Sequence, residues 1–376
     1  MRQAIGISRR AAVIGFVGSA LGACARATPG FTDRNGRPVP GSIAEQTWLP
    51  MPGAREYLLV RGRNIDAEAV LFLHGGPGGS ETALMRLYHP ALEDEFVMAY
   101  WDQRGAGRSW SADIPIETMT IAQFLQDMDQ VVDHLRRRLN RDRIWLLGHS
   151  WGSALGMLYL HRNPGKVAGY IGTGQVASVP MDELHAYEFT LQEARRRNDQ
   201  AALEKLRPIG PPPYTHDQLM VRDRLVDEYG GYFHVRPDQW QVAFRALTEL
   251  PETDIRDLVR LWRGTAFSQR ALWPAFARLD LTRQVPAVAR PVTFILGRYD
   301  HRDWSVYAAD YLAALSTPSK RLVWLENSAH NAPFEKPEAF RQAMIAAIKD
   351  ARTHRADSSC ASAISSRRSS TPEVAR

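Results

Sequence analysis

Cysteine is nearly absent from this chain: only Cys24 and Cys360 occur among its 376 residues, and both lie near the termini. So few cysteines exclude a disulfide framework and a cysteine-based metal site, and their positions outside the expected core make neither a plausible catalytic nucleophile. The chain also lacks an HExxH motif and any cluster of histidines with carboxylates. We therefore expect no metal and no other cofactor.

A concentrated basic region is also missing, although the formal net charge is +6. The basic residues are scattered, and the arginine triplets at residues 136–138 and 195–197 fall on helical patterns. Such triplets usually belong to a solvated helix face, so we expect no nucleic-acid partner. The chain length and the hydrophobic content of 44% predict a globular protein with a large core and room for an inserted subdomain.

The first 27 residues have the pattern of an export signal. Arginines precede an apolar run of small residues at 11–23, which is too short to span a membrane comfortably. The sequence LGAC, ending at Cys24, resembles a bacterial lipobox in which the cysteine is lipidated, and SRR before the run loosely resembles a twin-arginine signal. Cleavage after Ala27 and an uncleaved anchor are the alternatives. We thus expect an exported bacterial protein, periplasmic or membrane-anchored through lipidated Cys24.

Beyond the signal, the chain divides by pattern into a core, an insertion and two flanking segments. Residues 28–44 are rich in glycine and proline and predict a tether, whereas residues 353–376 are small, polar and basic and predict a disordered tail. Residues 45–176 and 289–352 alternate strands with helices, as an α/β core does. Residues 177–288 break that alternation with helical patterns, and we interpret them as a cap over the site.

The segment RIWLLGHSWGSAL at residues 143–155 carries the clearest motif. A buried strand pattern runs into GHSWG and then into a helix, which is the G-x-S-x-G nucleophile elbow. Small residues at Gly148 and Gly152 let the strand and the helix approach closely, and the serine stands at the helix N-terminus in strained backbone geometry. Ser150 is therefore the predicted nucleophile.

A glycine-rich turn, HGGPGG at residues 74–79, follows a buried strand pattern at residues 69–73. Its glycines permit backbone conformations that point N–H groups inward, as an oxyanion loop requires. A phosphate-binding loop is the alternative, but no GK[ST] sequence follows. We expect the backbone N–H of Trp151 and one N–H of this loop, placed at Gly76, to bind the oxyanion.

Asp300 and His330 complete a triad with Ser150 in the chain order Ser…Asp…His. Each of the three comes just after a predicted strand, and the carboxyl ends of parallel strands share one edge of a sheet, so these side chains can converge. His330 would accept the proton of Ser150, and Asp300 would fix the tautomer of the imidazole. Asp303 and Asp310 are weaker candidates because neither directly ends a strand.

The loop DQRGAGRS at residues 102–109 also comes close to the expected site, after a strand pattern at residues 96–101. Asp102 and Arg104 have two interpretations: contact with substrate, or a salt-bridged scaffold for the loop. We favour the scaffold.

Together these motifs resemble the α/β-hydrolase superfamily and, within it, the proline iminopeptidase (prolyl aminopeptidase) group of serine peptidases. The resemblance spans residues 45–350 and rests on HGGPGG at 74–79, DQRGAGRS at 102–109, SWGS at 150–153, GRYD at 297–300 and SAH at 328–330. It implies the α/β-hydrolase fold, with a mostly parallel eight-stranded sheet flanked by helices and an inserted helical cap.

Two positions depart from the family pattern. His149 stands where the family usually has glycine, and we expect this side chain to point away from the reaction. Those aminopeptidases bind the substrate's α-amino group with cap carboxylates, but the cap segment LVRLWRGTAF at residues 258–267 is basic. The unassigned acidic residues of the cap are Glu183, Glu188, Asp227, Glu228 and Glu249. An aminopeptidase should bury at least one unpaired carboxylate near Ser150.

Three functions fit the sequence, ranked from the best supported to the least. The first is a serine hydrolase that works through an acyl-enzyme, as an aminopeptidase releasing an N-terminal residue such as proline from peptides or amides. The second is an esterase of small carboxylic esters with the same triad. The third is a non-catalytic exported binding protein on the same fold, against which the intact triad argues.

Overall fold

The computed structural model describes residues 27–351, apart from the side chains of residues 239 and 240. Residues 1–26, most of the predicted export signal with Cys24, and residues 352–376, which include the predicted tail with Cys360, lie outside the described residues. Between residues 27 and 351, no helix is both long enough and apolar enough to cross a lipid bilayer.

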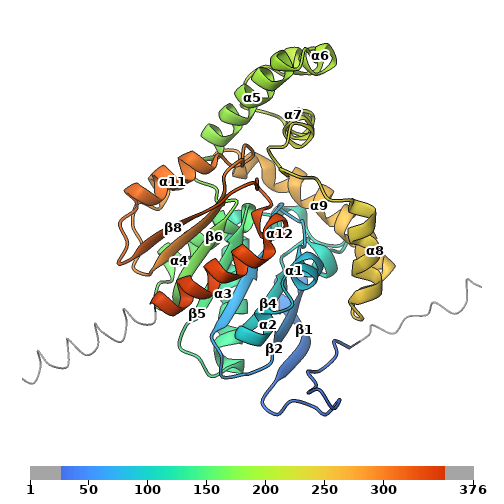
Figure 1. Ribbon diagram of the computed structural model, residues 1–376, viewed down its shortest axis with the longest axis vertical. Coiled ribbons are helices and arrows are strands. Elements are labelled where there is room, and N and C mark those ends of the chain that lie inside the picture. Colours follow the sequence, from blue (N-terminus) through green and yellow to red (C-terminus); the bar gives the residue numbers. More distant parts are fainter. Residues whose placement is uncertain (1–26, 352–376) are drawn as a thin grey trace, which may run out of the picture.

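One eight-stranded sheet forms the centre of the protein (Figure 1). The strands are β1 (Ile43–Met51), β2 (Ala54–Gly62), β3 (Ala69–Leu73), β4 (Val97–Asp102), β5 (Ile144–His149), β6 (Val167–Thr173), β7 (Val292–Gly297) and β8 (Lys320–Leu325). They lie in the order β1-β2-β4-β3-β5-β6-β7-β8. The pairs β1–β2 and β2–β4 are antiparallel, and all pairs from β4 to β8 are parallel. The predicted eight-stranded, mostly parallel sheet is confirmed.

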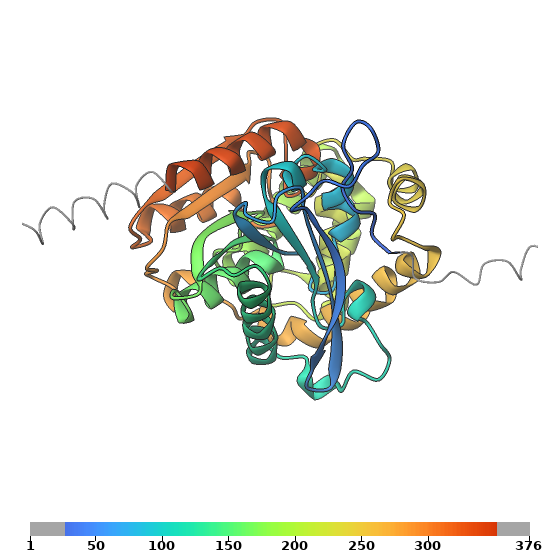
Figure 2. The ribbon, with the colours of Figure 1, turned by 90° about the horizontal axis from the view of Figure 1, so that it is seen from below.

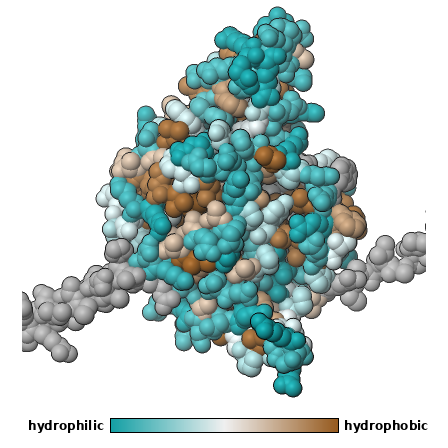
Figure 3. Space-filling view, in the orientation of Figure 1, coloured by the Kyte–Doolittle hydropathy of each residue, from teal (hydrophilic) through white to brown (hydrophobic). Residues whose placement is uncertain are grey.

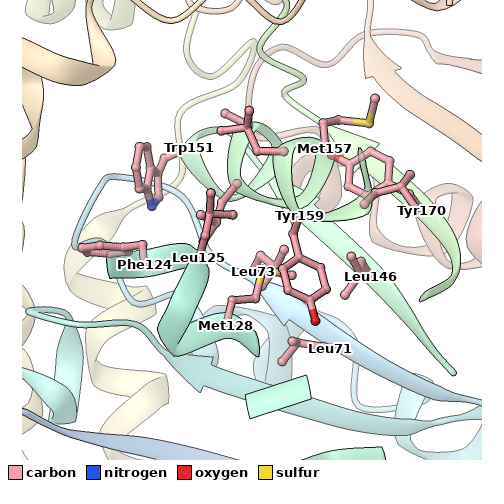
Figure 4. Packing of buried hydrophobic residues seen from close by; sticks show 14 of the residues in the cluster. Leu71, Leu73, Phe124, Leu125, Met128, Leu146, Trp151, Met157, Tyr159 and Tyr170 are labelled. Atoms are coloured by element: carbon pink, nitrogen blue, oxygen red, sulfur yellow. The ribbon is translucent and has the colours of Figure 1, made fainter. Parts of the chain in front are cut away.

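Helices cover both faces of the sheet. For this reason every residue of β3 to β7 is buried. Leu71 and Leu73 of β3 pack toward α3 and α4 on one face (Figure 4), while Val70 and Phe72 pack on the other face with a helix over residues 337–351. Seen from below, α3 and that last helix lie on opposite sides of the sheet (Figure 2). The flanking helices are α1 (Thr82–Tyr88), α2 (Leu92–Glu95), α3 (Ile121–Arg138), α4 (Trp151–Arg162), α11 (Ser305–Ala314) and α12 (Ala332–Glu335).

The chain between β6 and β7 is helical and lies above the sheet edge in Figure 1. Its helices are α5 (Val179–Arg196), α6 (Gln200–Ile209), α7 (His216–Glu228), α8 (Gln239–Glu249), α9 (Ile255–Phe276) and α10 (Leu281–Gln284). The longest of them, α9, is bonded to two core loops: the Thr265 hydroxyl donates to the Gly78 carbonyl (3.1 Å) and the Ser268 hydroxyl to the Gly105 carbonyl (3.0 Å). This helix therefore joins the cap segment to the loops around the expected site.

The segment predicted as a tether is in contact with the core. The Arg61 guanidinium of β2 donates to the Pro29 carbonyl (2.7 Å) and to the Thr28 hydroxyl, and Thr28 is buried. The end of the segment already belongs to β1, which begins at Ile43. Residues 28–42 thus lie against the first hairpin instead of extending from it.

Candidate active site

Ser150 occupies the sharp turn between β5 and α4. Its backbone has φ 53° and ψ −124°, a conformation that costs a non-glycine residue about 1 to 3 kcal/mol. Two hydrogen bonds hold the turn: the Ser150 N–H donates to the Thr173 carbonyl (3.1 Å), and the Ser153 N–H donates to the Ser150 carbonyl (2.8 Å). The predicted strained elbow is present at the predicted residue.

The two glycines of the motif make this turn possible by close approach. A Cβ on Gly152 would lie 2.0 Å from the Leu73 carbonyl oxygen, and a Cβ on Gly148 would lie 2.7 Å from the Gly152 carbonyl oxygen. Both contacts involve backbone atoms, which cannot move aside as a flexible side chain can. The elbow therefore requires glycine at both positions.

His330 and Asp300 form a buried acid–imidazole pair after β8 and β7. Nδ1 of His330 lies 3.0 Å from Oδ2 of Asp300, and Oδ1 of Asp300 accepts hydrogen bonds from the backbone N–H groups of Arg302 and Asp303, both at 3.0 Å. Nε2 of His330 is buried and has no hydrogen-bond partner among residues 27–351, Ser150 included. The structure thus shows the Asp–His contact directly and leaves Nε2 without a partner.

The charge around His330 favours its protonated form. Burial alone would lower the pKa of the imidazole, but the nearby carboxylates of Asp300 and Asp303 outweigh burial and raise the pKa above its ordinary value. Oδ2 of Asp303 is 3.9 Å from Nδ1, slightly farther than Asp300. Asp303, weighed at first as a rival to Asp300, therefore contributes charge beside the pair.

Gly76 and Trp151 are the predicted oxyanion donors. Gly76 has φ 116° and lines the same pocket as Ser150, and Trp151 is the first residue of α4, whose N–H has no acceptor inside the helix. Within the described part of the chain, neither backbone N–H donates a hydrogen bond. Both groups are thus free to bind a negatively charged oxygen near Ser150.

Gln103 joins the elbow to the glycine loop, a role that sequence reasoning missed. Its side-chain oxygen accepts from Trp151 Nε1 (2.8 Å), and its side-chain nitrogen donates to the His74 carbonyl (3.1 Å). Its backbone N–H donates to Nε2 of His74 (3.1 Å). No sequence pattern marks this role, because the buried amide of Gln103 meets the two motifs only in the folded structure.

Asp102 and Arg104, in the same loop, have scaffold contacts, as favoured from the sequence. Asp102 accepts from the hydroxyls of Ser80 (2.5 Å) and Thr82 (3.0 Å). Arg104 is fully buried and donates twice to Asp127, at 2.7 and 3.1 Å. Neither residue lines the pocket at Ser150.

A second acid–imidazole pair, Glu81 and His149, lies beside the first. Nδ1 of His149 is 2.8 Å from Oε1 of Glu81, and Nε2 of His149 is 3.2 Å from the His330 carbonyl oxygen. The other oxygen of Glu81 accepts from the Gly75 N–H (3.0 Å). Burial alone would raise the pKa of Glu81, but His149 and this N–H lower it below its ordinary value. The pair connects the glycine loop, the elbow and the His330 backbone. The ring of His149 lies beside the ring of His330, with centroids 5.0 Å apart, and does not point away from the site as we expected.

A small pocket at Ser150 lies between the core and the cap. It is lined by Gly76, Pro77, Ser150, Leu219, Asp223, Tyr232, Gln269, Trp273, Phe276 and Arg302. Leu219 and Asp223 stand four residues apart on α7, so they share one face of that helix. Asp223 is the cap carboxylate in this pocket, and it was not among the acidic residues singled out from the sequence.

Asp223 is ion-paired, unlike the unpaired carboxylate that we expected. Nε of Arg302 and Nη1 of Arg222 lie 3.1 and 2.8 Å from its Oδ1. Neither contact has the alignment of a hydrogen bond, and the Asp223 side chain accepts none from the described residues. A half-buried charge needs a compensating charge when no ligand is bound, which explains the arginines.

The arginines around Asp223 serve other carboxylates as well. Arg302 also lies 3.1 Å from Glu183 and 3.2 Å from Asp303, and Arg222 also contacts Glu183. Three carboxylates therefore share two guanidinium groups. Burial, together with the neighbouring acids Asp300 and Glu183, raises the pKa of Asp303 above its ordinary value.

Comparison with known proteins agrees with this geometry. A family model described as the alpha/beta hydrolase fold matches residues 68–337. The chain belongs to the α/β-hydrolase family. The eight-stranded sheet, the elbow and the inserted helices of this α/β-hydrolase match the fold expected from the sequence.

Relatives of this α/β-hydrolase carry peptidase names. It is 32% identical over 305 residues to the probable aminopeptidase YbaC of Bacillus subtilis (strain 168), covering 81% of this chain and 96% of that protein. It is 26% identical to the proline iminopeptidase of Heyndrickxia coagulans, covering 78% and 94%. The crystal structure of a proline iminopeptidase-related protein from Thermus thermophilus superposes with a TM-score of 0.60 at 21% identity, covering 82% and 98%. These relatives confirm the prediction that the chain is a hydrolase.

Proposed function

We propose that this α/β-hydrolase is a serine aminopeptidase, which releases an N-terminal residue such as proline from peptides or amides through an acyl-enzyme. The observation that carries the proposal is the position of Asp223, a cap carboxylate in the pocket of Ser150. The aminopeptidase names of its relatives support the same function.

In this mechanism Ser150 attacks the carbonyl carbon of the first residue. His330 accepts the hydroxyl proton at Nε2 and returns it to the leaving amine, while Asp300 stabilises the imidazolium that forms between these steps. The N–H groups of Gly76 and Trp151 bind the oxyanion, each contributing about 3 kcal/mol to the transition state. Water then attacks the acyl-enzyme with His330 acting again as base.

Asp223 would bind the α-ammonium of the substrate. Both arginines approach its Oδ1, so we assign the ammonium to Oδ2. An ammonium there gives the carboxylate the hydrogen bond that it lacks and balances the excess of acids in the network. The apolar side chains of Leu219, Trp273 and Phe276 would surround the small side chain of the first residue.

An esterase of small carboxylic esters is the second candidate. Arg302 lines the pocket and already pairs with Asp223, and Leu219, Trp273 and Phe276 provide apolar contacts that suit an uncharged ester. A non-catalytic binding protein ranks third, because the strained serine beside a buried acid–imidazole pair has no structural purpose in it.

A substrate panel separates these functions. We expect the protein to hydrolyse prolyl or alanyl nitroanilide much faster than the same compound with an acetylated amine, and a fluorophosphonate probe to label the wild type but not Ser150→Ala. Equal or faster turnover of nitrophenyl esters, with no preference for a free amine, would establish the esterase. If the probe labels neither protein, the non-catalytic binding protein is the remaining candidate.

We also propose that the protein is exported and held at a membrane by a lipidated Cys24. The lipobox-like LGAC sequence supports this. Cys24→Ser should move the protein from the membrane fraction of cells to the soluble fraction, and mass spectrometry of the wild type should find the lipid on the mature N-terminus. A protein that stays in the membrane fraction after this substitution would contradict lipid anchoring.

A further inference from the structure

One face of α9 exposes large apolar side chains to solvent. Ile255, Val259 and Trp262 are 61%, 49% and 75% exposed. Their spacing of four and three residues places them on a single stripe of the helix, which we call the outer stripe. The opposite side of α9 packs on the core, where Ser268 is fully buried. A stripe of this size is unusual on a soluble surface without a partner.

A row of arginines runs beside the outer stripe. Arg256, Arg263 and Arg270 are exposed and recur every seven residues, so they flank the apolar side chains along one side. The helix carries four arginines and one aspartate, Asp257, which pairs with Arg108 of the core (2.8 Å). The outer side of α9 is therefore both apolar and basic.

The contacts of these arginines leave them accessible to a new partner. Arg256 pairs with Asp254 at the helix N-cap, Arg270 lies 3.4 Å from Asp217, and Arg263 stands over the ring of Trp110. Exposed pairs of this kind are weak, because water and salt screen them. Anionic groups can therefore replace or join the existing contacts.

The described chain begins on the side of the molecule where α8 lies. In both ribbon views, the blue N-terminal part of the chain begins on the side of α8, while α11 lies on the other side (Figures 1 and 2). Phe244 of α8 is 65% exposed, and apolar side chains appear at the right-hand edge over α8 in Figure 3. Cys24, where we expect the lipid, precedes Ala27 by three residues. A lipid at that position would bring this side of the molecule near the bilayer.

We propose that the outer stripe of α9, with its arginine row, docks on an anionic lipid surface. The apolar side chains would enter the boundary between headgroups and acyl chains, Trp262 would lie at the level of the headgroups, and the arginines would pair with lipid phosphates. A second copy of the chain fits this surface less well, because two basic faces would repel each other. Docking would fix the orientation of the pocket, whose wall includes Gln269 and Trp273 of the same helix.

The experiment places a fluorescent reporter on this surface and on a matched surface elsewhere. In the full chain with Cys24→Ser and Cys360→Ser, Val259→Cys and Val306→Cys each supply one cysteine for an environment-sensitive dye. Both valines are 49% exposed, and Val306 belongs to α11. Vesicles contain phosphatidylglycerol and phosphatidylcholine in equal parts, or phosphatidylcholine alone.

We expect the dye at position 259 to shift to the blue and brighten about twofold or more with the anionic vesicles, and this response to disappear at high salt. Trp262→Ser in the same labelled chain should raise the lipid concentration for half-maximal response about tenfold, and Val306→Ser should not change it. No response at 259, or an equal response at 306, would overturn the proposal. A response without vesicles that grows with protein concentration would assign the surface to a second copy instead.

Discussion

The two walls of the pocket around Ser150 are built in different ways. The core wall consists of backbone turns and buried pairs: the elbow, the glycine loop and the Asp300–His330 contact. The cap wall consists of side chains on α7 and α9, and its charges depend on Arg302 and its partners. The difference indicates that the reaction and the choice of substrate depend on separable parts. Substitutions in the core wall should lower the rate of hydrolysis of every substrate. Substitutions in the cap wall should lower it only for some substrates.

The largest effect is expected from Gly152→Ala at the elbow. The new Cβ would meet the Leu73 carbonyl oxygen at 2.0 Å, so strand β3 and helix α4 would have to separate. We expect a loss of about 4 kcal/mol or more in the free energy of unfolding, measured by urea denaturation. Gly165→Ala is the matched control, because a Cβ there meets nothing within 4 Å. A Gly152→Ala protein as stable as the control would mean that the elbow is less tightly packed than the structure shows.

Asp223→Asn tests the cap wall. The substitution removes the charge that we assign to ammonium binding, so kcat/KM for a prolyl amide should fall about a hundredfold, while kcat/KM for an ester without an amine should change little. Asp227→Asn is the control, since Asp227 lies one turn further along α7, pairs with Arg236 and does not line the pocket. Equal losses for both substrates would place Asp223 in a structural role and contradict the aminopeptidase proposal.

Glu81 is a positioning residue of the core wall, so its substitution should lower kcat for all substrates alike. Its carboxylate holds both the Gly75 N–H and His149. Glu81→Ala should lower kcat about tenfold for amides and esters with little change in KM, and Glu81→Gln, which keeps a hydrogen-bonding oxygen, should recover part of that loss. A change confined to KM, or no difference between the two variants, would argue against a positioning role.

The smallest effect is a shift in pH dependence caused by Asp303→Asn. In the proposed mechanism His330 acts as a base only when neutral, so activity should fall as pH drops through its pKa, which the carboxylates of Asp300 and Asp303 raise. Removing one of these charges lowers that pKa, and the acidic limb of kcat/KM should move to lower pH by up to about one unit. Asp227→Asn should leave the limb in place. An acidic limb that does not move would show that Asp303 carries no charge beside His330.

Sequence reasoning found the core wall because its parts are short and local. The spacing of Gly148, Ser150 and Gly152 specifies a turn by itself, and the ends of parallel strands bring Asp300 and His330 to one edge. The same reasoning predicted a helical cap, but it did not identify which charged side chain of the cap lines the pocket.

The remaining contacts could not be predicted because they join distant residues without a pattern. Gln103 bonds to Trp151 48 positions away, and Glu81 meets His149 68 positions away. Asp223 resembles any acid on an exposed helix until the fold turns α7 toward the pocket. The segment before β1 reads as a linker by composition, yet a buried arginine of β2 binds it. Pairings of this kind depend on how helices pack, which one sequence does not encode in any short window.

The bonds from α9 to Gly78 and Gly105 restrict how this protein can diverge. A Cβ on Gly78 would lie 2.6 Å from Cβ of Ser268, and one on Gly264 would lie 2.7 Å from the Gly105 carbonyl oxygen. Mutation at these positions would displace the helix and the glycine loop together. New substrate preferences are therefore more accessible through α7, which contributes Leu219 and Asp223, than through α9. A mutant library for altered specificity should vary α7 and keep those glycines fixed.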